Sequence, residues 1–111
     1  NVAVLASGSL SHKLVSNDQV GDGQWEQVGS EFNRQMDLRV VDLWKQRRYK
    51  EFCALLPEYS TKCNGEALMC DTHMLFGMLG WGEFAGEMEE LTPYFPSSGS
   101  GQINVEFHLS K

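Results

Sequence analysis

The most informative stretch is Val2-Ala-Val-Leu-Ala-Ser-Gly-Ser-Leu-Ser-His12, an apolar run that ends in small residues and one imidazole. Its first part, residues 2–5, predicts a buried strand. The small residues at 7–9 leave room for backbone and ligand to approach closely where that strand ends. His12 is therefore a candidate acid/base group or metal ligand, because an imidazole gains and loses protons near neutral pH. The alternative is a half-exposed loop histidine without a chemical role.

Length and composition predict one globular domain with one core. The chain has 111 residues, 41% of them hydrophobic, and a formal net charge of −6. The acidic balance argues against a nucleic-acid partner, and the basic cluster Lys45-Gln-Arg-Arg48 is too short to reverse it. No apolar run approaches the roughly 20 residues that span a bilayer, so we expect no membrane partner.

The cysteines predict the cellular compartment, and the first residue predicts that the chain is part of a longer one. Cys53, Cys63 and Cys70 are an odd number without zinc-like spacing, which favours reduced thiols in a cytoplasmic protein. The sequence starts at Asn1, already inside a strand pattern. We therefore expect a piece of a longer polypeptide.

Two helices in series are predicted in the middle of the chain. Ser30 offers an N-cap, and an apolar stripe follows at steps of three and four: Phe32, Met36, Val40, Leu43 and Trp44. Asn33 and Asp37 fall off this stripe and are assigned to the solvated face. A second helical pattern starts near Tyr49 and is expected to end at Pro57. The polar residues 16–24 predict a surface loop.

The stretch Cys63–Trp81 predicts a further helix, apolar on nearly all sides and therefore buried. Asp71 stands out in it, because a buried carboxylate needs a cation, a metal or good donors. Glu66 is closer to the helix start, where the dipole favours a negative charge. His73 points to a different face from Asp71 and is interpreted as a packed or surface residue, as is His108. Strands are predicted at 87–95 and 103–109, with a turn at 96–101 between them.

Several separated blocks occur in one order that resembles the C-terminal part of the class III, LigB-type extradiol ring-cleavage dioxygenases. The blocks are Ala3-Val-Leu-Ala-Ser-Gly-Ser-Leu-Ser-His12, Glu31-Phe-Asn-Arg-Gln-Met-Asp37, Glu51-Phe-Cys53, Leu56-Pro-Glu-Tyr59 and Gly77-Met-Leu-Gly-Trp81. The resemblance covers the whole chain. It implies an α/β fold of strands packed with helices, with residues 1–111 as the C-terminal region and the N-terminal half of the domain absent.

The resemblance also implies a chemistry: cleavage of a catechol, 3,4-dihydroxyphenylacetate, by O2 at a non-haem Fe(II) site in aromatic catabolism. Such sites use two histidines and one carboxylate, and the family's two histidines lie in the N-terminal half. His12 matches the family's acid/base histidine. An ungapped comparison between Pro57 and Met78 places Asp71, where the family usually has Glu, at the carboxylate position, and a small register shift gives Glu66. Asp71 is favoured.

Two further expectations accompany this interpretation. A fragment should expose apolar surface that meets the missing half or another copy of the chain, so we expect association with that half or a homo-oligomer. The alternative function is a non-catalytic scaffold or partner-binding domain that keeps the dioxygenase fold, because the two histidine ligands are missing from this sequence.

Overall fold

The computed structural model describes residues 2–13, 18 and 27–109. In these residues the helices are α1 (Glu31–Lys45), α2 (Tyr49–Lys62), η3 (Glu66–Met69), α3 (Cys70–Leu79) and η4 (Trp81–Glu83), and the strands are β1 (Glu87–Glu90), β2 (Phe95–Ser97), β3 (Ser100–Gln102) and β4 (Val105–His108). This mixed architecture confirms the predicted α/β class. The loop predicted at 16–24 lies outside the described residues except for Asp18. No helix in the described ranges is both long and apolar enough to cross a bilayer.

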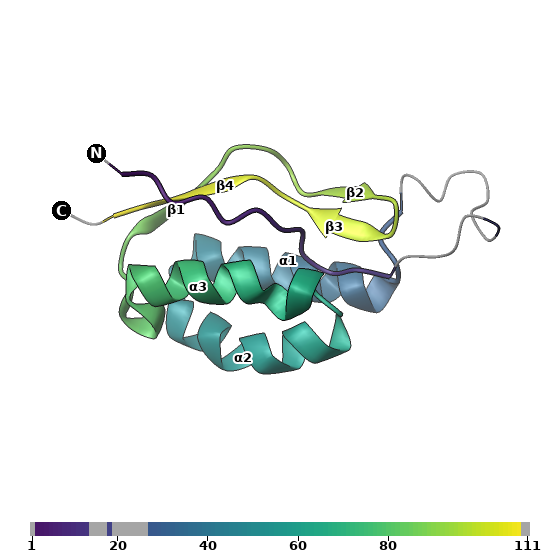
Figure 1. The fold of residues 1–111 in the computed structure, drawn as a ribbon, viewed down its shortest axis with the longest axis horizontal. Coiled ribbons are helices and arrows are strands. Elements are labelled where there is room, and N and C mark those ends of the chain that lie inside the picture. The colour runs from purple at the N-terminus through teal and green to yellow at the C-terminus, as the bar shows by residue number, and fades with distance from the viewer. Residues whose placement is uncertain (1, 14–17, 19–26, 110–111) are drawn as a thin grey trace.

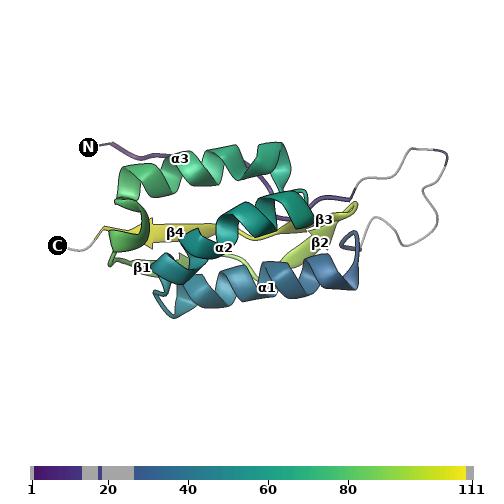
Figure 2. The same cartoon turned by 90° about the horizontal axis from the view of Figure 1, so that it is seen from below.

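The strands form a layer that lies on the helices (Figure 1). β1 pairs antiparallel with β4, and β2 pairs antiparallel with β3. Seen from below, α2 runs between α1 and α3 (Figure 2). No helix of the described residues covers the outer face of the strands, at the top of Figure 1. The exposed residues Glu106 and His108 alternate in β4 with the half-buried Val105 and Phe107, as a strand with one covered face requires.

An aromatic cluster joins the helices to β4 and forms the centre of the core. Phe76 is fully buried, with its ring centroid 4.8 Å from Phe52 and 5.2 Å from Phe107. Trp44 packs against the same rings. Edge-to-face ring pairs of this kind add to the energy of burial alone, so this cluster fixes how the helices meet the strand layer.

The start of α1 follows the sequence prediction, but its buried face is wider than predicted. Ser30 caps the helix, its Oγ accepting a hydrogen bond from the Asn33 N–H at 3.1 Å. Val40 and Trp44 are buried as expected, whereas Phe32 is exposed. The assignment of Asn33 and Asp37 to the solvated face is wrong, because both are buried. These two residues extend the face of Val40 and Trp44 by further steps of three and four.

The prediction that Pro57 ends the second helix is also wrong, because α2 continues through it to Lys62. An interior proline removes one helical hydrogen bond and costs about 3 kcal/mol. Residues beyond it bury enough surface to outweigh this cost: Tyr59 and Cys63 are fully buried and Ser60 nearly so. The Ser60 hydroxyl also donates to the Leu56 carbonyl at 2.7 Å.

The stretch 63–81 differs from the predicted buried helix in two respects. It is divided into η3, α3 and η4, and only Phe76 of α3 is buried. Met74, Met78 and Leu68 expose 63%, 67% and 60% of their surface. The helix is therefore apolar on a side that no described residue of this chain covers.

The first residues of the chain do not form the predicted buried strand. Residues 2–8 are extended, without an assigned strand, and Val2 and Leu5 are about nine-tenths exposed. Regular pairing begins at Leu10, whose N–H donates to the Gly101 carbonyl at 2.9 Å. The segment runs beside α3 in both views (Figures 1 and 2).

Candidate active site

His12 is held at the end of this extended segment by backbone contacts on two sides. Its N–H donates to the Cys63 carbonyl at 3.0 Å, at the end of α2. An isolated antiparallel bridge joins it to Ser100 of β3. The side chain is half-buried. The structure thus places the imidazole at a fixed point between β3 and α2, although the residues before it are not a strand.

The imidazole ring has a defined hydrogen-bonding arrangement. Its Nδ1 lies 3.1 Å from the Leu10 carbonyl oxygen. A carbonyl can only accept, so Nδ1 must carry the proton in this contact. In the neutral ring the lone pair is then on Nε2, which is the nitrogen free to accept a proton from a ligand.

Glu66 is connected directly to the segment that carries His12. Its Oε2 accepts a hydrogen bond from the Ser9 N–H at 2.6 Å and from the Ser9 hydroxyl at 3.2 Å. The Ser9 N–H is the main reason that the pKa of Glu66 is lowered; burial opposes this, and the Ser9 hydroxyl and His12 charge assist it. Glu66 does not cap a helix, since its carboxylate bonds to a distant segment instead.

Asp71 lies in the first turn of α3 and is exposed. The prediction that it is buried is therefore wrong. It has no hydrogen-bond or ion-pair partner in the described chain. A β-carbon built on Gly8 would lie 3.5 Å from Asp71 Oδ2 and 3.5 Å from Glu66 Oε2. Both candidate carboxylates thus face the same glycine, four residues before His12.

The turn after Glu66 is strained. Ala67, Leu68 and Met69 have φ values of 49°, 54° and 60°, in the left-handed region that residues other than glycine seldom occupy. Such conformations persist only where the surrounding structure imposes them, and they gather at ligand sites. Met69 anchors the turn, because it is 2% exposed in the core. Strain at this position is a feature of the site that the sequence did not reveal.

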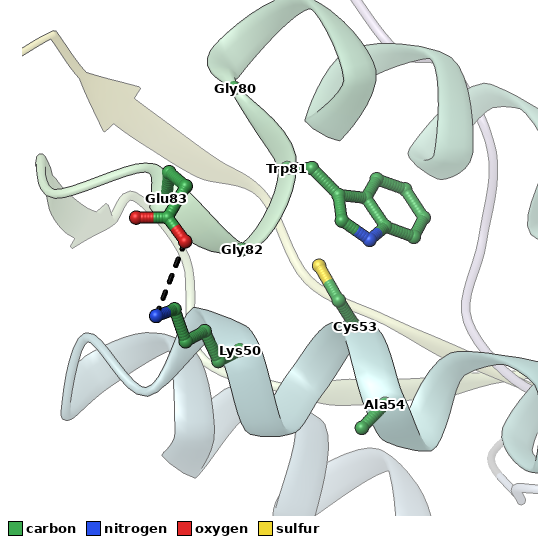
Figure 3. Close-up of a pocket in the computed structure, with 7 residues that line it drawn as sticks. All are labelled: Lys50, Cys53, Ala54, Gly80, Trp81, Gly82 and Glu83. Carbon is green, nitrogen blue, oxygen red and sulfur yellow. Dashed lines mark ion pairs between the residues drawn. The ribbon is translucent and has the colours of Figure 1, made fainter.

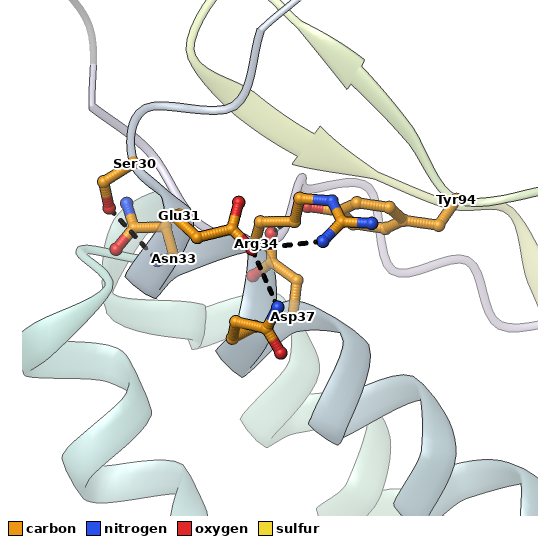
Figure 4. Close-up of polar contacts among 7 residues, drawn as sticks. Ser30, Glu31, Asn33, Arg34, Asp37 and Tyr94 are labelled. Atoms are coloured by element: carbon orange, nitrogen blue, oxygen red, sulfur yellow. Dashed lines mark hydrogen bonds and ion pairs between the residues drawn. The ribbon is translucent and has the colours of Figure 1, made fainter.

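Asp37 is the residue that sequence reasoning missed. It is fully buried, and its carboxylate accepts from the Ser11 N–H at 3.2 Å, the Ser11 hydroxyl at 2.6 Å and the Tyr59 hydroxyl at 2.6 Å. The Tyr94 hydroxyl also donates to it (Figure 4). Burial, aided by the carboxylate, raises the pKa of both tyrosines, so they remain donors. The spacing 33, 37, 40, 44 could have identified this buried position.

Two other features lie apart from these residues. A surface hollow between α2 and η4 is lined by Lys50, Cys53, Ala54, Gly80, Trp81, Gly82 and Glu83, and none of the candidates is among them (Figure 3). Glu89, Glu106 and His108 form an exposed group on β1 and β4. In the described chain, His12, Glu66 and Asp71 do not form a group of three possible metal ligands like this one. His73 is outside the candidate site, and its Nδ1 lies 2.8 Å from the Met69 carbonyl oxygen.

Comparison with known proteins gives this geometry its context. Residues 1–108 match the family model described as the catalytic LigB subunit of aromatic ring-opening dioxygenase. The chain belongs to this LigB family. It is also similar to the 3,4-dihydroxyphenylacetate 2,3-dioxygenase of Escherichia coli, with 50% identity over 94 residues. That alignment covers 85% of this chain and 34% of the relative, so the chain spans about a third of the length of the curated protein it matches.

Proposed function

We propose that this chain forms part of an extradiol dioxygenase that cleaves 3,4-dihydroxyphenylacetate with O2, contributing His12 as acid/base group and Glu66 as carboxylate ligand of a non-haem Fe(II). LigB membership and the named relative support the reaction class and the substrate. The single observation that carries the site is the Ser9–Glu66 contact, which joins the carboxylate to the segment that ends in His12.

Glu66 fits a ligand role better than Asp71, which the sequence favoured. A metal ligand must be ionised, and the Ser9 N–H lowers the pKa of Glu66 further below its ordinary value. Metal-binding carboxylates are usually oriented by a further hydrogen bond, which Ser9 supplies to Glu66 and no described residue supplies to Asp71. The strained turn that follows Glu66 is a further sign of a functional site.

The two histidine ligands would come from outside these 111 residues. The chain has three histidines, and neither His73 nor His108 lies in a metal-binding group with Glu66. The relative is about three times as long as the matched region. We propose that its additional part of the fold has a counterpart that completes the site.

His12 would move the protons. Nε2 accepts a proton from a catechol hydroxyl, and the Nδ1–H bond to Leu10 strengthens as the ring becomes positive. The protonated Nε2 can then return its proton to an oxygen of the opening ring. The chemistry that iron(II) supplies when bound is activation of O2 beside the diol.

The exposed apolar residues support contact with the rest of the fold. Val2, Leu5, Met74 and Met78 lie on the N-terminal segment and on α3, which run side by side (Figure 2). We propose that the part of the LigB fold beyond this chain covers them. Met78→Glu should weaken association with that part in size-exclusion chromatography, whereas Leu91→Glu, exposed on the loop after β1, should not.

The test of the active site compares Glu66→Gln with Asp71→Asn in the assembled enzyme, measuring bound iron and the yellow ring-opened product. Glu66→Gln should lower iron affinity by about 10–100-fold or more and abolish turnover, and Asp71→Asn should leave both near wild type. The reverse pattern would assign the ligand to Asp71.

His12→Phe provides the second arm of the experiment. It should keep iron and lower turnover by about 100-fold or more, as expected for loss of a general acid/base group. Full turnover in this variant would exclude His12 from the reaction. A wild-type preparation that holds iron and yet forms no product would favour the non-catalytic scaffold.

A further inference from the structure

The acid/base role of His12 depends on which ring nitrogen carries the proton, and that depends on the backbone before it. Nδ1 contacts the carbonyl of Leu10, two residues earlier. Ser11 lies between them, so any rotation of the backbone at Ser11 changes the direction of this carbonyl relative to the ring. A structure that fixes Ser11 therefore fixes the tautomer of the neutral imidazole, that is, which of the two ring nitrogens carries the proton.

Ser11 is held from two sides: the Gly101 N–H of β3 donates to its carbonyl at 3.1 Å, and the Asp37 carboxylate binds its other two polar groups. Both its N–H and its hydroxyl donate to Asp37, to different oxygens of the same group. Both residues are fully buried. A two-point contact constrains the orientation of Ser11 as well as its position, which a single hydrogen bond does not do.

Asp37 is itself held from two other elements. Tyr59 of α2 donates to Oδ1, and Tyr94, before β2, donates to Oδ2. Figure 4 shows Asp37 on α1 with Tyr94 reaching it from the strand layer. β3 closes the remaining side, since a β-carbon on Gly101 would lie 1.9 Å from Asp37 Oδ2. The carboxylate thus has a fixed place relative to α1, α2 and the strands.

We propose that Asp37 is a positioning residue that acts through Ser11 to hold His12 with Nδ1 protonated and Nε2 free. Asp37 need not touch substrate or metal for this role. The proposal rests on the proposed function, in which Nε2 of His12 is the working base. The buried hydrogen bonds of Asp37 then do more than stabilise the core, because two of them come from Ser11, the residue next to His12.

The test reads the ring directly, without iron or catechol. Histidine-selective 15N labelling of the full 111-residue chain gives signals from only His12, His73 and His108, and His12→Gln identifies its own. At a pH where the ring is neutral, the nitrogen shifts report the ratio of the two tautomers. We expect the wild-type ring to be mostly the Nδ1–H form.

Two matched pairs of variants separate positioning from stability. Ser11→Ala removes a buried hydroxyl bonded to Asp37, and Ser60→Ala removes a buried hydroxyl bonded to the Leu56 carbonyl, away from His12. Asp37→Asn disturbs the network, whereas Asp42→Asn removes an exposed charge on the same helix. All are compared by tautomer ratio and by melting temperature.

Ser11→Ala and Asp37→Asn should lower the Nδ1–H to Nε2–H ratio by about fivefold, the equivalent of one net hydrogen bond, and Ser60→Ala and Asp42→Asn should leave it unchanged. If Asp37→Asn does not fold, Ser11→Ala decides the question. A lower melting temperature with an unchanged ratio in Ser11→Ala would overturn the proposal. Failure of the proposed function would be seen separately, with the ring result intact: full turnover of His12→Phe would remove the acid/base role of His12, and an iron-loaded wild type without product would remove the dioxygenase assignment.

Discussion

Gly101→Ala should be strongly destabilising, because the added methyl group has no space. Its β-carbon would lie 1.9 Å from Asp37 Oδ2, 2.3 Å from the Tyr94 hydroxyl oxygen and 2.9 Å from Asp37 Cγ. Comfortable contacts between such atoms are about 3.5 Å. Either β3 or the carboxylate must therefore shift by more than an ångström, and a shift of the carboxylate breaks hydrogen bonds that it accepts from Ser11 and Tyr94.

The size of the effect follows from two contributions. Overpacking a well-packed interior costs about 1–3 kcal/mol, and each lost hydrogen bond to a charged group costs about 1.5–3 kcal/mol. We expect the free energy of unfolding to fall by about 4 kcal/mol, a large part of the roughly 5–15 kcal/mol that holds a domain together. Urea denaturation followed by circular dichroism measures this difference.

Gly77→Ala is the matched control. It adds the same methyl group, but apart from the neighbouring backbone of its own helix no described atom lies within 4 Å of that β-carbon. Gly77 is inside α3, where alanine is favoured over glycine by about 0.5–1 kcal/mol, so this variant should be slightly more stable than wild type. If the free energy of unfolding of Gly101→Ala lay within about 1 kcal/mol of the wild-type value, the close packing of β3 on Asp37 would be refuted.

Three further predictions concern the core, the thiols and the site. Phe76→Ala should lower the unfolding free energy by about 3–5 kcal/mol in the same urea assay, because a fully buried ring is removed from the aromatic cluster. At pH 8 a thiol reagent should label one cysteine quickly, Cys70, because Cys53 and Cys63 are buried and burial raises the pKa of Cys63 to about 11; rapid labelling of all three would contradict this. The pKa of Glu66 is lowered, so its link to Ser9 is fully formed above the usual glutamate value of 4.5 and is lost as the pH falls through the lower folded value; the Ser9 amide signal should titrate below pH 4.5 in wild type and stay constant in Glu66→Gln.

The sequence predicted those elements whose signals are local. The Ser30 cap, the helix after it and the strand near residues 105–108 depend on hydrogen bonds and alternation within a few residues. The turn predicted at 96–101 is confirmed only at Ser98 and Gly99, which adopt positive φ; the residues on either side of them form the short strands β2 and β3. The end of α2 could not be predicted from Pro57, since burial of Tyr59 and Cys63 by distant residues decides it.

The site was predicted less completely, for a different physical reason. His12 was identified from the small residues around it, and both Glu66 and Asp71 do face Gly8. Their relative merits depend on a contact with Ser9, 57 positions away from Glu66, which no local pattern contains. Asp37 was assigned to the solvated face because it falls off the stripe that includes Phe32 and Met36. Phe32 is exposed, and the spacing of Asp37 from Val40 and Trp44 matches the face that is buried.

The donors around Asp37 are all uncharged: two tyrosine hydroxyls, one serine hydroxyl and one backbone amide in the described chain. Dissolved ions weaken attractions between exposed opposite charges, such as the Lys62–Glu58 pair on α2, but have little influence on short bonds between a buried group and neutral dipoles. The position of the His12 imidazole should therefore be insensitive to ionic strength. A salt concentration high enough to screen the surface ion pairs should leave the ring in place.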